Sequence, residues 1–168
     1  YNASMKRHLM SQLVTWKNAK SRKPLILKGV RQAGKTHLLM QFGHEQFKRA
    51  HHINFEKQIH LNNLFDRDLK PQRILNDLRF ELGIDIDIKQ DLLIFDEIQA
   101  CPNALTSLKY FCEDLPELAL CSAGSLLGLH LNEASYPVGK VDMMHLYPMS
   151  FSEFLSGIGD DMAADFIA

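Results

Sequence analysis

The segment 29–36 reads GVRQAGKT, which fits the spacing G-x-x-x-x-G-K-[ST]. Gly29 and Gly34 allow backbone angles that residues with a Cβ avoid, and such a loop turns its N–H groups inward to bind phosphate oxygens. Lys35 can then reach the β- and γ-phosphates of a nucleotide, and the Thr36 hydroxyl is an oxygen ligand of the kind that Mg²⁺ prefers. A helix that starts at Thr36 aims its positive end at the same phosphates. The residues expected to bind the nucleotide are Gly29, Arg31, Gln32, Ala33, Gly34, Lys35, Thr36 and His37.

Two adjacent carboxylates, Asp96 and Glu97, follow the apolar run 92–95 in the manner of a Walker B motif. An Asp at the carboxyl end of a buried strand can hold Mg²⁺, usually through its water shell. The Glu after it points in another direction and can orient or deprotonate an attacking water. Two solvated acids at a strand end are the alternative, but the Walker A loop in the same chain favours the functional interpretation. We expect Thr36 and Asp96 to hold the metal, and Lys35 and Glu97 to serve catalysis.

A third polar motif, Ser122-Ala-Gly-Ser125, ends the expected strand 118–122. Ser125 could lie between the two motifs above and sense the γ-phosphate, which makes it a third catalytic candidate. Capping of a helix N-terminus by Ser122 or Ser125 is the alternative, because serine is frequent at that position. The two roles are compatible, and both remain open.

Other polar residues give weaker signals. Arg31 could contact phosphate, pair with an acid or face a neighbouring chain. Asn54 and Glu56 end the expected strand 51–56; Glu56 could support Mg²⁺ or water, although a solvated strand end is the favoured interpretation. His51 and His52 should point to opposite faces of that strand, so they do not form a metal site together. No metal other than the Mg²⁺ of the nucleotide is predicted.

The pattern of apolar residues predicts strands that alternate with helices. Such alternation favours one parallel sheet joined by right-handed crossovers, which is an α/β fold. The segment 84–88 could be a strand or a loop. We expect strands at 24–28, 51–56, 92–95, 118–122 and 141–147, and helices at 4–18, 36–48, 71–83, 102–115, 124–131 and from 150 onward.

The totals describe a globular chain of 168 residues with a formal net charge of −1. The chain therefore has no overall excess of positive charge that would favour binding to nucleic acid, and no apolar run is long enough to span a membrane. Three cysteines without a C-x-x-C spacing favour reduced core thiols and a cytoplasmic setting. The first residue is Tyr, and the last segment has a helix-like composition, so we expect a piece of a longer protein.

Four segments together resemble a large family of predicted bacterial and archaeal AAA-like ATPases. The loop 29–36 is similar to the family's G-x-R-Q-x-G-K-T, and Phe-Asp-Glu-Ile-Gln at 95–99 is similar to its Walker B motif. Ala-Gly-Ser at 123–125 and LYPMSFSEFL at 146–155 resemble two further family motifs. The resemblance implies a P-loop three-layer α/β/α sandwich of the AAA/RecA-like type, whose sheet is mainly parallel and in which the sensor strand lies between the Walker A and Walker B strands. The family uses a water-activating Glu.

The resemblance also implies ATP with Mg²⁺ and a further C-terminal domain of unknown function related to restriction-endonuclease-like folds. One departure is Gly139-Lys140, where relatives commonly have Gly-Arg. If that Arg acts on the γ-phosphate, Lys140 is a weaker substitute, because it lacks the planar guanidinium. On this basis we divide the chain into an N-terminal helix and link (1–23), an ATPase core (24–147) and the start of a C-terminal helical segment (148–168).

The sequence therefore predicts an ATP hydrolase in which Lys35, Glu97 and Ser125 act on the nucleotide. The alternative is a nucleotide-gated switch with little turnover, which signals to the C-terminal domain or to a partner. A small-molecule kinase is a third class, disfavoured because the region after the last strand contains no Arg. A homo-oligomer or a protein partner remains open, and no residue pattern points to nucleic acid or a membrane.

Overall fold

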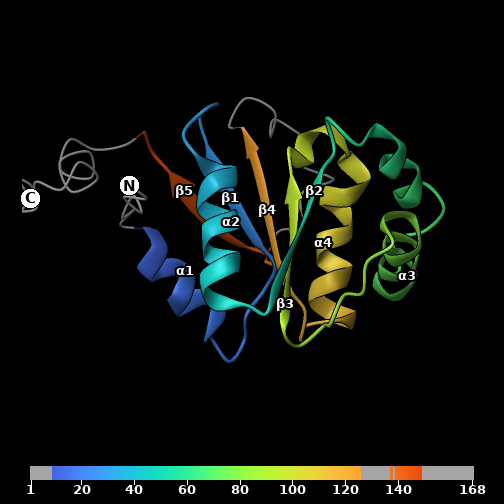
Figure 1. Ribbon diagram of the computed structural model, residues 1–168, viewed down its shortest axis with the longest axis horizontal. Coiled ribbons are helices and arrows are strands. Elements are labelled where there is room, and N and C mark those ends of the chain that lie inside the picture. Colours follow the sequence, from blue (N-terminus) through green and yellow to red (C-terminus); the bar gives the residue numbers. More distant parts are fainter. Residues whose placement is uncertain (1–8, 126–136, 138, 149–168) are drawn as a thin grey trace, which may run out of the picture.

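The computed structural model describes residues 9–125, 137 and 139–148 of the chain. Its strands are β1 (Leu25–Gly29), β2 (Arg49–Asn54), β3 (Asp91–Asp96), β4 (Ala119–Ser125) and β5 (Asp142–Leu146). Among the described residues, these strands form one sheet in the order β2-β3-β4-β1-β5, and every neighbouring pair is parallel (Figure 1). The strand that carries Ser125, β4, lies between β1 and β3, as the family resemblance implied.

Helices cover both faces of the sheet. The α-helices are α1 (Leu9–Lys17), α2 (Lys35–Gln46), α3 (Pro71–Leu82) and α4 (Pro102–Asp114), and two short 3₁₀ helices are η1 (Ile59–Phe65) and η2 (Ile98–Ala100). One core cluster joins α1 and α2 to the sheet, and the other joins α3 and α4 to it (Figure 1). The arrangement is a three-layer α/β/α sandwich with a parallel sheet, which confirms the predicted fold class.

The first core cluster holds α2 against the sheet; this helix follows the Gly-rich loop, residues 29–34. Leu9, Leu13 and Trp16, which recur at spacings of four and three on one face of α1, are buried in the same cluster as the apolar residues of α2. The Trp16 ring lies 6.2 Å from that of Phe42, and its Nε1 donates a hydrogen bond to the Lys23 carbonyl at 2.9 Å. The indole therefore buries its ring while its only polar group is satisfied.

The second core cluster fixes β3. Phe95 is fully buried and meets the rings of Phe55, Phe65 and Phe111 edge to face, with ring centroids 5.3, 5.8 and 6.1 Å apart. Such edge-to-face pairs add to the free energy gained by burial. Because Phe95 immediately precedes Asp96, this packing holds the carboxyl end of β3 in place.

Two of the expected thiols are core residues. Cys101 and Cys121 are buried, Cys112 is half-buried, and all three are free. Burial raises the pKa of the Cys121 thiol well above its ordinary value.

No helix in the described part of the chain combines the length and apolar character needed to cross a bilayer.

Some predicted boundaries were wrong. Strand β2 pairs with β3 from Arg49 to Asn54, and the chain then turns, with the Asn54 side chain accepting hydrogen bonds from the backbone of Glu56 and Lys57. Glu56 therefore lies beyond the strand that was expected to contain it. The segment 84–88 is a loop, one of the two alternatives.

The helix expected at 124–131 does not begin where predicted. Gly124 and Ser125 continue β4 because they pair with Lys28 and Gly29 of β1. The rest of that helix, the helix expected from 150 onward and the first residues of the helix expected at 4–18 lie outside the described residues.

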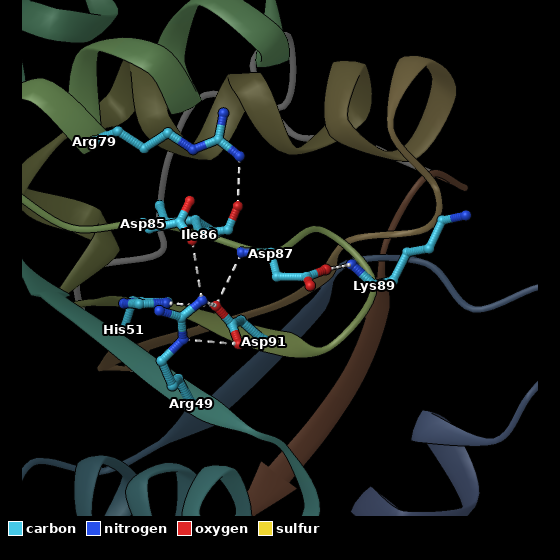
Figure 2. Close-up of polar contacts among 8 residues, drawn as sticks. All are labelled: Arg49, His51, Arg79, Asp85, Ile86, Asp87, Lys89 and Asp91. Atoms are coloured by element: carbon cyan, nitrogen blue, oxygen red, sulfur yellow. Dashed lines mark hydrogen bonds and ion pairs between the residues drawn. The ribbon is translucent and has the colours of Figure 1, made fainter.

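A buried carboxylate organises the edge of the sheet at which the strands begin (Figure 2). Asp91 accepts hydrogen bonds from His51 Nε2 at 2.9 Å and from the Asp87 backbone at 2.9 Å, and its Oδ2 lies 3.1 Å from Arg49 Nη2. Burial raises the pKa of Asp91, but the hydrogen bonds from His51, Asp87 and Arg49 outweigh burial and leave that pKa below its ordinary value.

We expect Asp91→Asn to lower the free energy of unfolding by about 1–3 kcal/mol at neutral pH, because Arg49 and His51 lose a buried ionic acceptor. The contribution of Asp91 is present above its unfolded-state pKa of about 3.9 and is lost as the pH falls through its lower folded-state pKa. Denaturant unfolding from pH 7 to pH 3 should therefore show a difference between wild type and variant that shrinks on acidification. Asp85→Asn is the matched control, because that side chain pairs with Arg49 but is 82% exposed. Equal stability of both variants and wild type would contradict the assignment.

Candidate nucleotide-binding site

The carboxyl ends of all the described strands meet at one edge of the sheet. Asn54 pairs with Asp96, and Gly29 lies between Ser125 on one side and Leu146 on the other. The parallel register therefore brings the Gly-rich loop, the acidic pair and the third motif to the same place, although they are distant in sequence.

Gly34 has the role that the sequence predicted for it. It is the N-terminal cap of α2 and has the left-handed angles φ 90° and ψ 20°. Helix α2 begins at Lys35, one residue earlier than predicted. Gln32 also has a positive φ, 62°, so the loop curls in front of the N-terminus of α2. Exposed N–H groups in that first turn make a site for anions.

Gly29 is required for a reason other than the one predicted. It is not among the residues of positive φ. Instead, a Cβ built at Gly29 would lie 2.4 Å from the Leu146 carbonyl oxygen, a backbone atom of the neighbouring strand. The constraint is therefore close packing of β1 against β5 rather than an unusual backbone angle.

Lys35 is folded beneath the loop. It is 6% exposed, and its Nζ donates hydrogen bonds to the carbonyls of Gly29 at 3.0 Å and Val30 at 2.8 Å. Burial lowers the pKa of Lys35, and the carboxylates of Glu97 and Asp96 oppose that shift. The ammonium group thus lies within the field of both predicted carboxylates.

Asp96 is the centre of the polar contacts. Its Oδ2 accepts hydrogen bonds from Thr36 Oγ1 at 2.9 Å, His52 Nε2 at 3.0 Å and Asn54 Nδ2 at 3.3 Å. Its Oδ1 accepts one from the Glu97 backbone N–H at 3.0 Å. Burial raises the pKa of Asp96, but the bonds from His52 and Thr36 outweigh burial, so its pKa is lowered and the carboxylate is ionised at neutral pH.

Glu97 follows the last residue of β3, Asp96, and differs from it in backbone conformation and in partners. Its φ of 50° places it in the left-handed region, where a residue other than glycine is uncommon. Its carboxylate accepts a hydrogen bond from the Gln99 side-chain amide. The sequence analysis named Gln99 only within the motif 95–99 and His52 only as a rejected metal ligand, so it missed both contacts. The signal for His52 was its position two residues before Asn54, on the same face of β2.

The remaining predicted residues lie around this centre. Arg31 is exposed and its guanidinium lies 3.6 Å from the Glu56 carboxylate, which is the acid pairing among its three alternatives. Gln32 and His37 are exposed, and Ala33 is half-buried. Ser125 ends β4 beside Gly29.

Ser122 does not cap a helix. It is buried inside β4, and its hydroxyl donates a hydrogen bond to the Leu25 carbonyl at 3.0 Å. The capping alternative was therefore wrong for this residue.

Lys140 lies at the opposite edge of the sheet. It precedes β5, and its Nζ lies 3.0 Å from Glu113 near the end of α4. This pairing raises the pKa of Lys140. Lys140 therefore lies near the amino ends of β1 and β5, whereas the Gly-rich loop follows the carboxyl end of β1, so Lys140 is remote from the candidate site of its own chain.

Comparison with known families agrees with this geometry. The profile of a family described as an AAA domain matches residues 21–155, which is most of the chain. The chain belongs to this AAA domain family. The match includes the Gly-rich loop, the acidic pair and Ser125. No curated protein sequence matches the chain.

Solved structures share the fold of this AAA domain. The Walker-type ATPase PABY2304 of Pyrococcus abyssi matches with a TM-score of 0.57 and 16% identity, over 92% of this chain and 57% of that protein. DnaA from Aquifex aeolicus bound to AMPPCP matches with a TM-score of 0.56 and 16% identity, over 95% and 55%. Aeropyrum pernix ORC1 in complex with DNA matches with a TM-score of 0.54 and 14% identity, over 98% and 50%. The chain thus spans between 50% and 57% of the length of each.

We expect Gly29→Ala to destabilise the AAA domain by about 1–3 kcal/mol, because the new methyl group overlaps a backbone oxygen that can move only with β5. Thermal unfolding measures the effect. Val30→Ala is the neighbouring control, since the Val30 side chain is 45% exposed and should contribute little. If Gly29→Ala melts at the wild-type temperature, the close approach of Leu146 is not a constraint.

Proposed function

We propose that this AAA domain binds ATP together with Mg²⁺ and hydrolyses it to ADP and phosphate. The observation that carries the proposal is the 2.9 Å hydrogen bond between the Thr36 hydroxyl and the Asp96 carboxylate, formed beside the buried Lys35. Three residue types needed for phosphoryl chemistry thus converge from two distant segments of the chain. The choice of ATP over other nucleotides rests on the AAA family.

Phosphate binding would use the loop and the first turn of α2. Backbone N–H groups from Arg31 to Thr36 would surround the phosphates, and the positive end of α2 favours an anion there. Lys35 Nζ would exchange its bonds to Gly29 and Val30 for bonds to phosphate oxygens. Because Lys35 is already buried at this point, it needs only a local change to reach the ligand.

The oxygen donors of Thr36 and Asp96 fit Mg²⁺, which takes a few protein oxygens and completes its shell with phosphate and water. Their 2.9 Å contact brings both oxygens close enough to serve one metal ion. The Thr36 hydroxyl would be a direct ligand, and Asp96 would accept hydrogen bonds from metal-bound water. Mg²⁺ would supply positive charge to the β- and γ-phosphate oxygens. Asp96 is held in the ionised form that this role requires.

Glu97 would orient or deprotonate the attacking water, and Ser125 would contact the γ-phosphate from the end of β4. Glu97 directly follows the proposed metal-binding residue, but its backbone is left-handed and its carboxylate is held by Gln99, which is not a partner of Asp96. The different partners suit two carboxylates with different tasks, one for the metal and one for water.

A nucleotide-gated switch with little turnover is the second candidate. Two observations favour it: Gln99 already holds the Glu97 carboxylate, and Lys140 lies at the wrong edge of the sheet to assist the γ-phosphate. In that case ATP would be retained, and its presence would be signalled to the proposed C-terminal domain, to a protein partner or to another copy of the chain.

The test is to measure nucleotide binding and phosphate release with Mg²⁺ for wild type, Lys35→Ala and Glu97→Gln. Lys35→Ala should lose nucleotide affinity, because it removes the charge that faces the phosphates. Glu97→Gln should keep the affinity and lose about 10²- to 10⁴-fold in turnover, since it removes the general base.

The results separate the two candidates. Hydrolysis in Glu97→Gln at the wild-type rate would disprove the role of Glu97. Tight binding by wild type without phosphate release would favour the switch, and no binding by wild type would overturn both candidates.

We expect Lys140→Ala to release phosphate at the wild-type rate, because its exposed ion pair with Glu113 is remote from the P-loop. Steady-state turnover measured at saturating nucleotide tests this, with Lys35→Ala as the inactive reference. A large loss of turnover in Lys140→Ala would mean that the residue acts at a site other than that of its own chain.

A further inference from the structure

We propose that His52 is a positioning residue for the Mg²⁺ site, which fixes the Asp96 carboxylate in the orientation that the metal needs. The inference rests on the proposed function, and it concerns a residue that lies outside the Gly-rich loop and outside the acidic pair Asp96-Glu97. His52 comes from β2, the strand next to the one that carries Asp96.

The register of β2 and β3 brings His52 to Asp96. Asn54 pairs directly with Asp96, and His52 is two residues earlier, so its side chain projects from the same face of the sheet as that of Asn54. Ala50, two residues earlier again, packs in the core cluster of α2, as do Leu92 and Ile94 of β3. His52, Asn54 and Asp96 therefore all face the side of the sheet on which Thr36 begins α2.

The direction of the hydrogen bond follows from chemistry. An ionised carboxylate can only accept, so His52 must donate through Nε2–H. The bond is 3.0 Å long, against 3.3 Å for the bond from Asn54 to the same oxygen. Among the groups that lower the pKa of Asp96, the hydrogen bond from His52 has the largest effect. His52 is thus a close donor to this carboxylate that, unlike Thr36, is not itself a proposed metal ligand.

Loss of the His52 side chain should affect the binding of Mg²⁺ and not the contacts to the phosphates. Without His52, Asp96 Oδ2 keeps the long bond from Asn54 and the bond from Thr36, which is itself a proposed metal ligand. Together with the bond from the Glu97 backbone to Oδ1, these contacts would hold the carboxylate less firmly, and part of its orientation would have to be fixed when the metal binds. Groups that orient a metal ligand in this way are commonly worth about 10- to 100-fold in metal affinity. The phosphate contacts of the loop and Lys35 do not involve His52, so nucleotide affinity without metal should not change.

The experiment measures the affinity of a slowly hydrolysed ATP analogue, first in EDTA and then over a Mg²⁺ titration. The proteins are wild type, His52→Ala, His52→Gln and His44→Ala. His52→Gln offers an amide donor in place of the imidazole, and His44 is an exposed histidine on α2. Far-UV circular dichroism and thermal unfolding check that each variant is folded, and His52→Gln still tests the inference if His52→Ala is unstable.

We expect His52→Ala to need about 10- to 100-fold more Mg²⁺ for half-maximal enhancement of nucleotide binding, with unchanged affinity in EDTA. His52→Gln should recover part of the loss, and His44→Ala should match wild type. An unchanged Mg²⁺ requirement in both His52 variants overturns the inference, as does an equal loss of affinity in EDTA. If wild type itself binds no nucleotide, or binds it without any effect of Mg²⁺, the proposed function fails and the inference with it.

Discussion

The position of the Asp96 carboxylate depends on hydrogen bonds from three parts of the chain, and the geometry of the site depends on that carboxylate in turn. It is 2% exposed, and a buried charge is tolerated only where hydrogen bonds replace water. Those bonds come from Thr36 at the start of α2, from His52 and Asn54 of β2, and from the backbone of Glu97. Satisfying one buried anion therefore fixes how α2, β2 and β3 meet.

Much of the fold was predictable because its signals are local. The apolar run before Asp96 predicted a buried strand, and the helix expected at 71–83 matches α3, which begins at Pro71 and is capped by Gly83. The boundaries that failed depend on pairing. Gly124 belongs to β4 because β1 lies beside it, and the limits of β2 follow the length of β3. Neither neighbour can be read from the residues of the strand itself.

In the candidate site, too, the residues with local sequence signals were predicted, and those that depend on contacts between distant segments were not. Lys35, Thr36, Asp96 and Glu97 belong to compact motifs, so their types and spacing were sufficient to place them at one sheet edge. The reason for Gly29 was missed because its constraint is a carbonyl at Leu146, far along the chain. His52 was missed because its partner is determined by strand register, and the distance of Lys140 from the site became clear only from the start of β5. Motifs led to the proposed chemistry, whereas the supporting contacts could be found only from the topology.

Two consecutive histidines on β2, His51 and His52, also help to set the register of β2 against β3. His51 binds Asp91 where β3 begins, on one face, and His52 binds Asp96 where β3 ends, on the other. A shift of β2 by one residue would send every side chain to the opposite face, break both contacts and remove Ile53 from its core cluster with Phe55 and Phe95. Within the described sheet β2 is an edge strand, the kind that can pair wrongly with another chain. The two histidine–aspartate contacts admit one alignment, so they protect this edge against mispairing as well as supporting the site.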